Sequence, residues 1–179
     1  MALSHDQGQR SSALLHGNLH QLCQTHSIDP VSIKRVVYHA GPGFYTGLRI
    51  AYGVAQILKL DGAAVHGFYS HDLPRLINAE NYQWITKAYR GEVYVYDGGT
   101  ATSKLMSEDE FLAQDWSGDV YIHHPQALDE RMATKLTHAK RTEKIATEQF
   151  VKLLASLENS PEAPLHYFRA PEEEFRPST

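Results

Sequence analysis

The sequence predicts an α/β protein built as two lobes. Three observations predict this: a strand–helix–strand pattern over residues 35–68, an aromatic hairpin pattern over 83–96, and a change of composition near residue 80. A strand–helix–strand unit gives parallel strands through a right-handed crossover, whereas a two-residue turn gives antiparallel strands. We therefore expect a first lobe over residues 1–80 and a second lobe over 81–179.

The first lobe begins with a predicted helix over residues 9–23. One apolar edge of that helix is formed by leucines spaced at i, i+4 and i+7, namely Leu15, Leu19 and Leu22. A strand over 35–39 lacks strict alternation, as expected when both of its faces are covered. A helix over 46–59 follows and ends at Asp61-Gly62, before a second apolar strand over 63–68.

The second lobe is richer in antiparallel signals. Strands over 83–89 and 92–96 flank Arg90-Gly91, and a third strand over 102–106 follows the Asp97-Gly98-Gly99 turn. Ser107 and Glu110 have the spacing of a capping box that opens a short helix. We also expect a strand over 119–123 and a helix over 142–157. The side chains of that helix predicted to point inward are Ile145, Phe150, Val151 and Leu154.

Composition excludes several classes of function. The 179 residues are 42% hydrophobic and 21% charged with a net charge of -4, which gives no global reason to bind nucleic acid or an anionic membrane. A single cysteine, Cys23, excludes an intrachain disulfide and a thiolate metal cage. No signal peptide or apolar run of membrane-spanning length is visible, so we expect a cytoplasmic protein. The eleven histidines have no physical explanation.

The turn between the first strand and the second helix contains Gly41, Pro42, Gly43 and Gly47. A phosphate-binding loop would carry a lysine after its last glycine, and none is present. A dinucleotide fingerprint needs free backbone N–H groups at the turn, but Pro42 removes one of them. We therefore favour close packing over cofactor binding, and expect no cofactor.

The helix after this turn carries few charges. Gly47, Ala51 and Ala55 form a ridge of small residues that would let a second helix approach closely. Its polar edge consists of Arg49, Tyr52, Gln56 and Lys59. Such an apolar helix must be covered on more than one face, either by its own chain or by another subunit.

Other candidate sites are weaker. His16 and His20 have zinc-ligand spacing but lack further ligands, and alternation would send His123 and His124 to opposite faces of a strand. A basic run is more typical of a solvated face than of an RNA contact: Lys135, Lys140, Arg141 and Lys144. No nucleophile, base and orienting group come together, so we expect no catalytic residue and no metal site.

Three segments resemble the signatures of the TsaB (YeaZ) family. They are 40-AGPGFYTGLRI-50, 89-YRGEVY-94 and 164-PLHYFR-169, and they occur in the family's order. The resemblance implies an actin-like, ribonuclease-H-like α/β fold in two lobes. It also implies a non-catalytic partner of TsaD, the subunit that transfers a threonylcarbamoyl group to a tRNA adenosine, with a TsaE-like ATPase as a further partner.

In that family the first two helices contact TsaD or a second copy. The resemblance therefore implies an interface formed by Leu15, Leu19, Leu22, Gly47, Leu48, Ala51, Tyr52 and Ala55. It also implies that the turn positions the interface helix through Gly41, Pro42, Gly43 and Thr46.

The sequence departs from the family in three places. The family's first strands are missing, so we expect a shortened N-terminal lobe with a bare strand edge at 36–39. Lys87 replaces an acidic residue, and Tyr69 and Leu73 stand where catalytic relatives carry metal-binding histidines. Each departure weakens an enzymatic interpretation.

We expect an oligomer, most simply a homodimer, because two parallel strands alone do not make a stable sheet in water. The N-terminal residues, a second copy or the natural partner could cover the bare edge. Two alternative functions stay open: a nucleotide-binding enzyme that uses the 41–47 turn, and a diverged, self-associating paralogue outside the tRNA pathway.

Overall fold

A computed structural model describes residues 11–89, 91–160 and 162–169, and divides the chain into two units. Unit 1 comprises Met1–Phe68 and Leu157–Tyr167, and unit 2 comprises Tyr69–Ser156 and Phe168–Thr179. The mixed α/β class is confirmed, but the boundary at residue 80 is wrong. The segment after residue 68 packs into unit 2, and the end of the chain returns to unit 1 before it enters unit 2.

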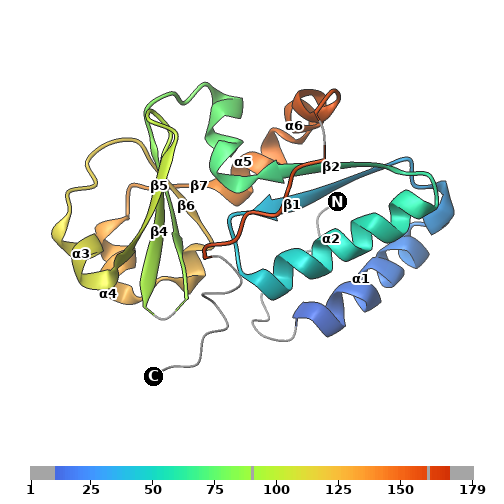
Figure 1. The fold of residues 1–179 in the computed structure, drawn as a ribbon, viewed down its shortest axis with the longest axis horizontal. Helices are drawn as coiled ribbons and strands as arrows, with labels where there is room; N and C mark the ends of the chain where they lie inside the picture. Colours follow the sequence, from blue (N-terminus) through green and yellow to red (C-terminus); the bar gives the residue numbers. More distant parts are fainter. Residues whose placement is uncertain (1–10, 90, 161, 170–179) are drawn as a thin grey trace. The chain divides into compact units, whose positions relative to one another are not determined.

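Unit 1 contains the predicted strand–helix–strand pattern. Its elements are α1 (Ser11–Thr25), the short 3-10 helix η2 (Pro30–Ser32), β1 (Arg35–Gly41), α2 (Tyr45–Leu60) and β2 (Ala64–Tyr69). The two strands are neighbours in a two-stranded sheet and run in the same direction, and α1 lies beside α2 (Figure 1). Among the described residues no further strand joins this sheet.

Unit 2 contains a five-stranded sheet. Its strands are β3 (Gln83–Lys87), β4 (Glu92–Asp97), β5 (Thr102–Ser107), β6 (Val120–His123) and β7 (Lys140–Arg141), in the order β5-β4-β3-β6-β7. β3, β4 and β5 are antiparallel, whereas β6 is parallel to β3, and β7 is parallel to β6. The predicted hairpin and third strand are confirmed.

One face of this sheet is aliphatic. It carries Ile85, Val93, Val95, Val120 and Ile122, all buried. Two short helices contribute the rest of this core: α3 (Glu108–Ala113) through Phe111, and α4 (Glu130–Lys135) through Met132. The predicted capping box at the start of α3 is present, because Ser107 and Glu110 bond to each other's backbone N–H.

The opposite face is aromatic, because the residues that alternate with the aliphatic ones are Trp84, Tyr94, Tyr96, Tyr121 and His123. The 3-10 helix η3 (Ser70–Ile77) places the His71 ring 4.0 Å from the Tyr96 ring, between centroids. Burial also raises the pKa of nearby Tyr82 to about 12, and its hydroxyl donates to the His71 carbonyl at 2.7 Å. These contacts explain why the chain joins unit 2 at residue 69.

The helix predicted over 142–157 is broken into α5 (Thr142–Glu148) and α6 (Phe150–Leu157). Gln149, at φ -106° and ψ 23°, ends α5 and shifts the helical phase. Ile145 is buried as predicted and Leu154 is half-buried, but Phe150 and Val151 are 51% and 79% exposed, so their predicted inward orientation is wrong. Leu153 and Leu157 are buried instead.

Candidate functional site: the glycine turn and the C-terminal segment

The glycine turn contacts residues 162–167, which we call the C-terminal segment. Gly41 has φ +124°, a conformation that favours glycine, and a Cβ there would overlap the carbonyl of His166. His166 N donates to Ala40 O at 2.8 Å, and Gly43 N donates to His166 O at 3.2 Å. Gly43 and Tyr167 form a parallel β-bridge. The glycines therefore allow an extended segment of the same chain to pack closely against the turn, as the packing interpretation predicted, and the sequence does not indicate which segment this is.

One of these contacts uses a backbone N–H of the turn that a phosphate would need. Helix N-termini and glycine turns bind anions through free N–H groups. Pro42 has no N–H, and that of Gly43 points to the His166 carbonyl. The turn therefore favours a structural role over the nucleotide-binding alternative.

The same segment covers the polar edge of α2. The Glu162 carboxylate accepts a hydrogen bond from Lys59 Nζ at 2.6 Å and another from the Gln56 amide. The pKa of Glu162 is lowered mainly by its hydrogen bond from Lys59. The pKa of Tyr52 is raised mainly by the hydrogen bond between Tyr52 and Glu162. The predicted polar edge thus contacts a carboxylate of its own chain.

Tyr38 anchors the segment from β1. Its hydroxyl donates to Ala163 O at 2.5 Å, and a Cβ on Gly67 of β2 would lie 2.8 Å from both the Tyr38 ring and the Ala163 methyl group. Both strands of unit 1 therefore contribute to the position of the segment.

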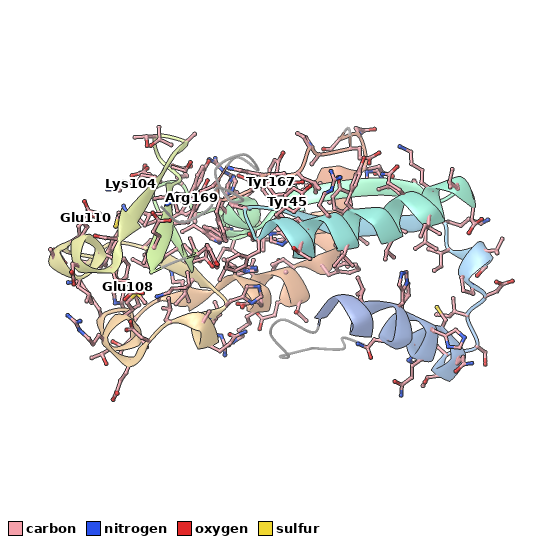
Figure 2. The ribbon with its side chains drawn as sticks, turned by 60° about the horizontal axis from the view of Figure 1, so that its bottom comes forward. Tyr45, Lys104, Glu108, Glu110, Tyr167 and Arg169 are labelled. Carbon is pink, nitrogen blue, oxygen red and sulfur yellow. The ribbon has the colours of Figure 1, made fainter. Side chains whose placement is uncertain are left out.

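Aromatic and charged groups continue these contacts along the chain. The Tyr45 and Tyr167 ring centroids are 5.0 Å apart, and Figure 2 shows the two residues together at the start of α2. Within unit 2, the Phe168 ring lies 5.4 Å from Tyr94, and Arg169 Nε donates to Glu92 at 3.1 Å. The signature segment 164–169 therefore contacts segment 40–50 within unit 1 and segment 89–94 within unit 2.

The predicted interface residues of α2 do not share one exposed surface. Leu48 and Ala55 are 5% and 0% exposed because they pack inside unit 1, so their prediction as surface contacts is wrong. Ala51 and Tyr52 are half-buried, whereas Thr46 and Gly47 are exposed. The α1 residues Leu15, Leu19 and Leu22 are half-buried.

The apolar side chains that α2 does expose were not predicted. Ile57 and Leu60 are 55% and 88% exposed, and a Cβ on Gly53 would meet nothing within 4 Å. These three positions are spaced by four and three residues, so they share a helix face, which we call the outer face of α2. Which edge of α2 stays exposed depends on the contact with Glu162, and that contact has no local signal in the sequence.

The two histidine pairs lie on α1 and at the end of β6. His16 and His20 are both exposed on α1. The rings of His123 and His124 are only 4.1 Å apart, contrary to the predicted opposite faces, because His124 has a left-handed backbone (φ 54°) that ends the alternation. Within the described part of the chain, no three His, Cys, Asp or Glu residues are placed to hold a metal ion.

The positions that depart from the family pattern have structural partners. Lys87 forms an ion pair with Glu108. Leu73 is 2% exposed, and the Tyr69 ring stacks on His71 with the ring centroids 5.4 Å apart.

Among residues 11–89, 91–160 and 162–169, no helix has the length and apolar character needed to cross a membrane.

Comparison with known proteins gives a match at the level of the fold. No protein-family model and no curated protein sequence matches the chain. The structure is similar to YeaZ from Pseudomonas aeruginosa, with 19% identity, a TM-score of 0.50, and coverage of 92% of this chain and 90% of that one. It is also similar to an uncharacterised protein from P. aeruginosa described as having similarity to peptidase YeaZ, with 17% identity, a TM-score of 0.50, and coverage of 88% and 83%. The expected YeaZ-like fold is confirmed.

Proposed function

We propose that this chain is a TsaB-like scaffold subunit that binds a TsaD-like catalytic partner in the threonylcarbamoylation of tRNA, with no catalysis of its own. Without that partner, it pairs with a second copy through unit 1. The proposal is supported by the YeaZ-like fold together with the three signature segments, the last of which contacts the first within unit 1 and the second within unit 2.

One observation carries the proposal. The turn that could have held a phosphate is filled by residues 166–167, while the helix that follows it exposes large apolar side chains. Burial of such side chains against a partner is favourable by roughly 1.5–3 kcal/mol each. The arrangement is therefore suited to association rather than to nucleotide chemistry.

Co-purification with the TsaD-like protein of the same organism tests the proposal. The variant Ile57→Glu/Leu60→Glu places two charges on the outer face of α2, and Val151→Glu places one on an equally exposed position of α6. We expect the first variant to lose the partner and the homodimer, because unpaired charges at an interface core are costly. The α6 variant should keep both.

The competing functions predict other results. ATP turnover or tight ATP, ADP or NAD(P) binding by the purified chain, lost on substitution of Gly43, would favour the nucleotide-binding enzyme. Self-association through α2 without any retention of the TsaD-like protein would favour the diverged paralogue.

A further inference from the structure

A surface cavity of about 390 Å³ lies at one edge of the unit 2 sheet. Its apolar wall includes Ile122, Leu128, Leu136 and Ala139. Ile122 and Leu136 belong to the buried aliphatic core, against which Leu128 and Ala139 pack. The cavity is therefore a place where the core of unit 2 reaches the surface.

Arg141 stands at the rim of this cavity and is exposed. The other members of the basic run have partners: Lys135 donates to Leu112 O at 2.6 Å, Lys140 pairs with Asp119 at 2.9 Å, and Lys144 pairs with Glu148 at 3.6 Å. No carboxylate of the described residues lies within ion-pair distance of Arg141. Its planar guanidinium can bind a carboxylate through two parallel hydrogen bonds.

Arg141 also belongs to the last strand of the sheet. β7 has only two residues, and among the described residues no strand follows it in the order β5-β4-β3-β6-β7. The outer backbone groups of an edge strand can pair with an incoming strand. An apolar cavity, a cation and a strand edge are thus adjacent.

We propose that the β7 edge binds an extended segment of a partner protein, which places a large aliphatic side chain in the cavity and a carboxylate on Arg141. In an added strand, residues i and i+2 point to the same face, so an aliphatic residue two positions before an acidic one satisfies both contacts. The site lies in unit 2 and is independent of the scaffold function proposed for unit 1.

The probe is the peptide acetyl-Thr-Val-Thr-Leu-Thr-Glu-amide, titrated into the full ¹⁵N-labelled chain with the affinity and the shifted amides read by NMR. Peptides with Glu replaced by Gln, or Leu by Ser, are the ligand controls. We expect shifts around Ile122, Leu136 and Arg141. Arg141→Gln should weaken binding of the Glu peptide about tenfold or more but not that of the Gln peptide.

Two further variants separate the charge from the cavity. Arg131→Gln removes the same charge from α4 at a position outside the cavity lining, and should leave the affinity unchanged. Ala139→Leu keeps Arg141 and fills the cavity, so the Leu peptide should no longer bind this variant more tightly than the Ser peptide does.

Several results would overturn the proposal. Equal affinities for the Arg141→Gln and Arg131→Gln variants would show that the carboxylate does not bind Arg141. Competition by decanoate with the same amide shifts would make this a site for a small amphiphile. Self-association that is lost in Arg141→Gln would make the occupant a second copy of the chain.

Discussion

The strands of the two units obtain their hydrogen-bond and packing partners in different ways. In unit 2, five strands pair with one another, an aliphatic face packs on α3 and α4, and an aromatic face packs on η3. In unit 1, two strands are hydrogen-bonded to each other, and the end of β1 is completed by residues from the far end of the chain. The strands of unit 2 therefore come from one continuous stretch of the chain, to which Phe168 and Arg169 add contacts with Tyr94 and Glu92. In unit 1, by contrast, β1 is completed by a segment that is more than 100 residues away.

This difference indicates where each unit is sensitive to change. Unit 2 should respond to the loss of core volume, as closely packed interiors do. Unit 1 should respond to changes that displace the C-terminal segment, even where they remove no apolar contact. Five substitutions, each measured against a control or against one another, test this comparison.

The largest effect is expected for Phe111→Ala in unit 2. Phe111 is 0% exposed and stacks on Trp116 with centroids 5.0 Å apart. Truncating a buried phenylalanine costs about 3–5 kcal/mol of unfolding free energy. Urea denaturation followed by tryptophan fluorescence measures it, and Val151→Ala, at an exposed position, should change stability by less than about 0.5 kcal/mol. Equal effects for the two variants would contradict the assigned core.

Gly41→Ala should have the next largest effect, and should act in unit 1. The substitution forces a side chain into φ +124° and into the His166 carbonyl, so we expect a loss of about 2–3 kcal/mol. Gly62→Ala is the matched control, because Gly62 has φ +93° but open space around it, and should lose only about 1 kcal/mol. The difference between the two variants, measured by urea denaturation, isolates the contact with the segment.

Local patterns made much of this fold predictable. Alternation and turn residues located β3, β4 and β5, and the spacing of Ser107 and Glu110 identified the cap of α3. The pairing of Gly41 with His166 could not be predicted, because a glycine in a turn does not show which distant backbone approaches it. The outer face of α2 was missed for a related reason: periodicity finds an apolar face, but the segment at 162–167 decided which edge of the helix was covered.

Two tyrosines allow a closer comparison of the units. Tyr38 donates to the Ala163 carbonyl in unit 1, and Tyr82 donates to the His71 carbonyl in unit 2. Tyr82→Phe should cost about 1–3 kcal/mol, since His71 is buried and its carbonyl loses a donor, whereas Tyr38→Phe should cost about 1 kcal/mol. Limited proteolysis should cleave near residue 160 faster only in Tyr38→Phe. Faster cleavage there in both variants would show that Tyr38 does not specifically hold the segment.

The smallest effect concerns Glu162, and it is seen in the pH dependence of stability. The hydrogen bond from Lys59 lowers the pKa of Glu162 in the folded chain below its usual value of 4.5. Because the folded pKa lies below the unfolded one, this interaction contributes its full stability above about pH 4.5 and loses it as the pH falls through the folded pKa. The interaction should therefore contribute fully to stability near neutral pH and should contribute nothing in strongly acidic solution.

Glu162→Gln removes the charge, so its stability should approach that of the unmodified chain as the pH is lowered from 6 to 3. At pH 6 we expect a loss of about 0.5–1 kcal/mol, because the pair lies at the surface of unit 1. Glu158→Gln is the control: its carboxylate lies 3.9 Å from Arg35 and its side chain is 65% exposed, so the substitution should change stability less at pH 6 than Glu162→Gln does. Parallel curves for the two variants between pH 3 and 6 would mean that Glu162 is no better anchored than an ordinary surface carboxylate, and that backbone contacts alone hold the segment on unit 1.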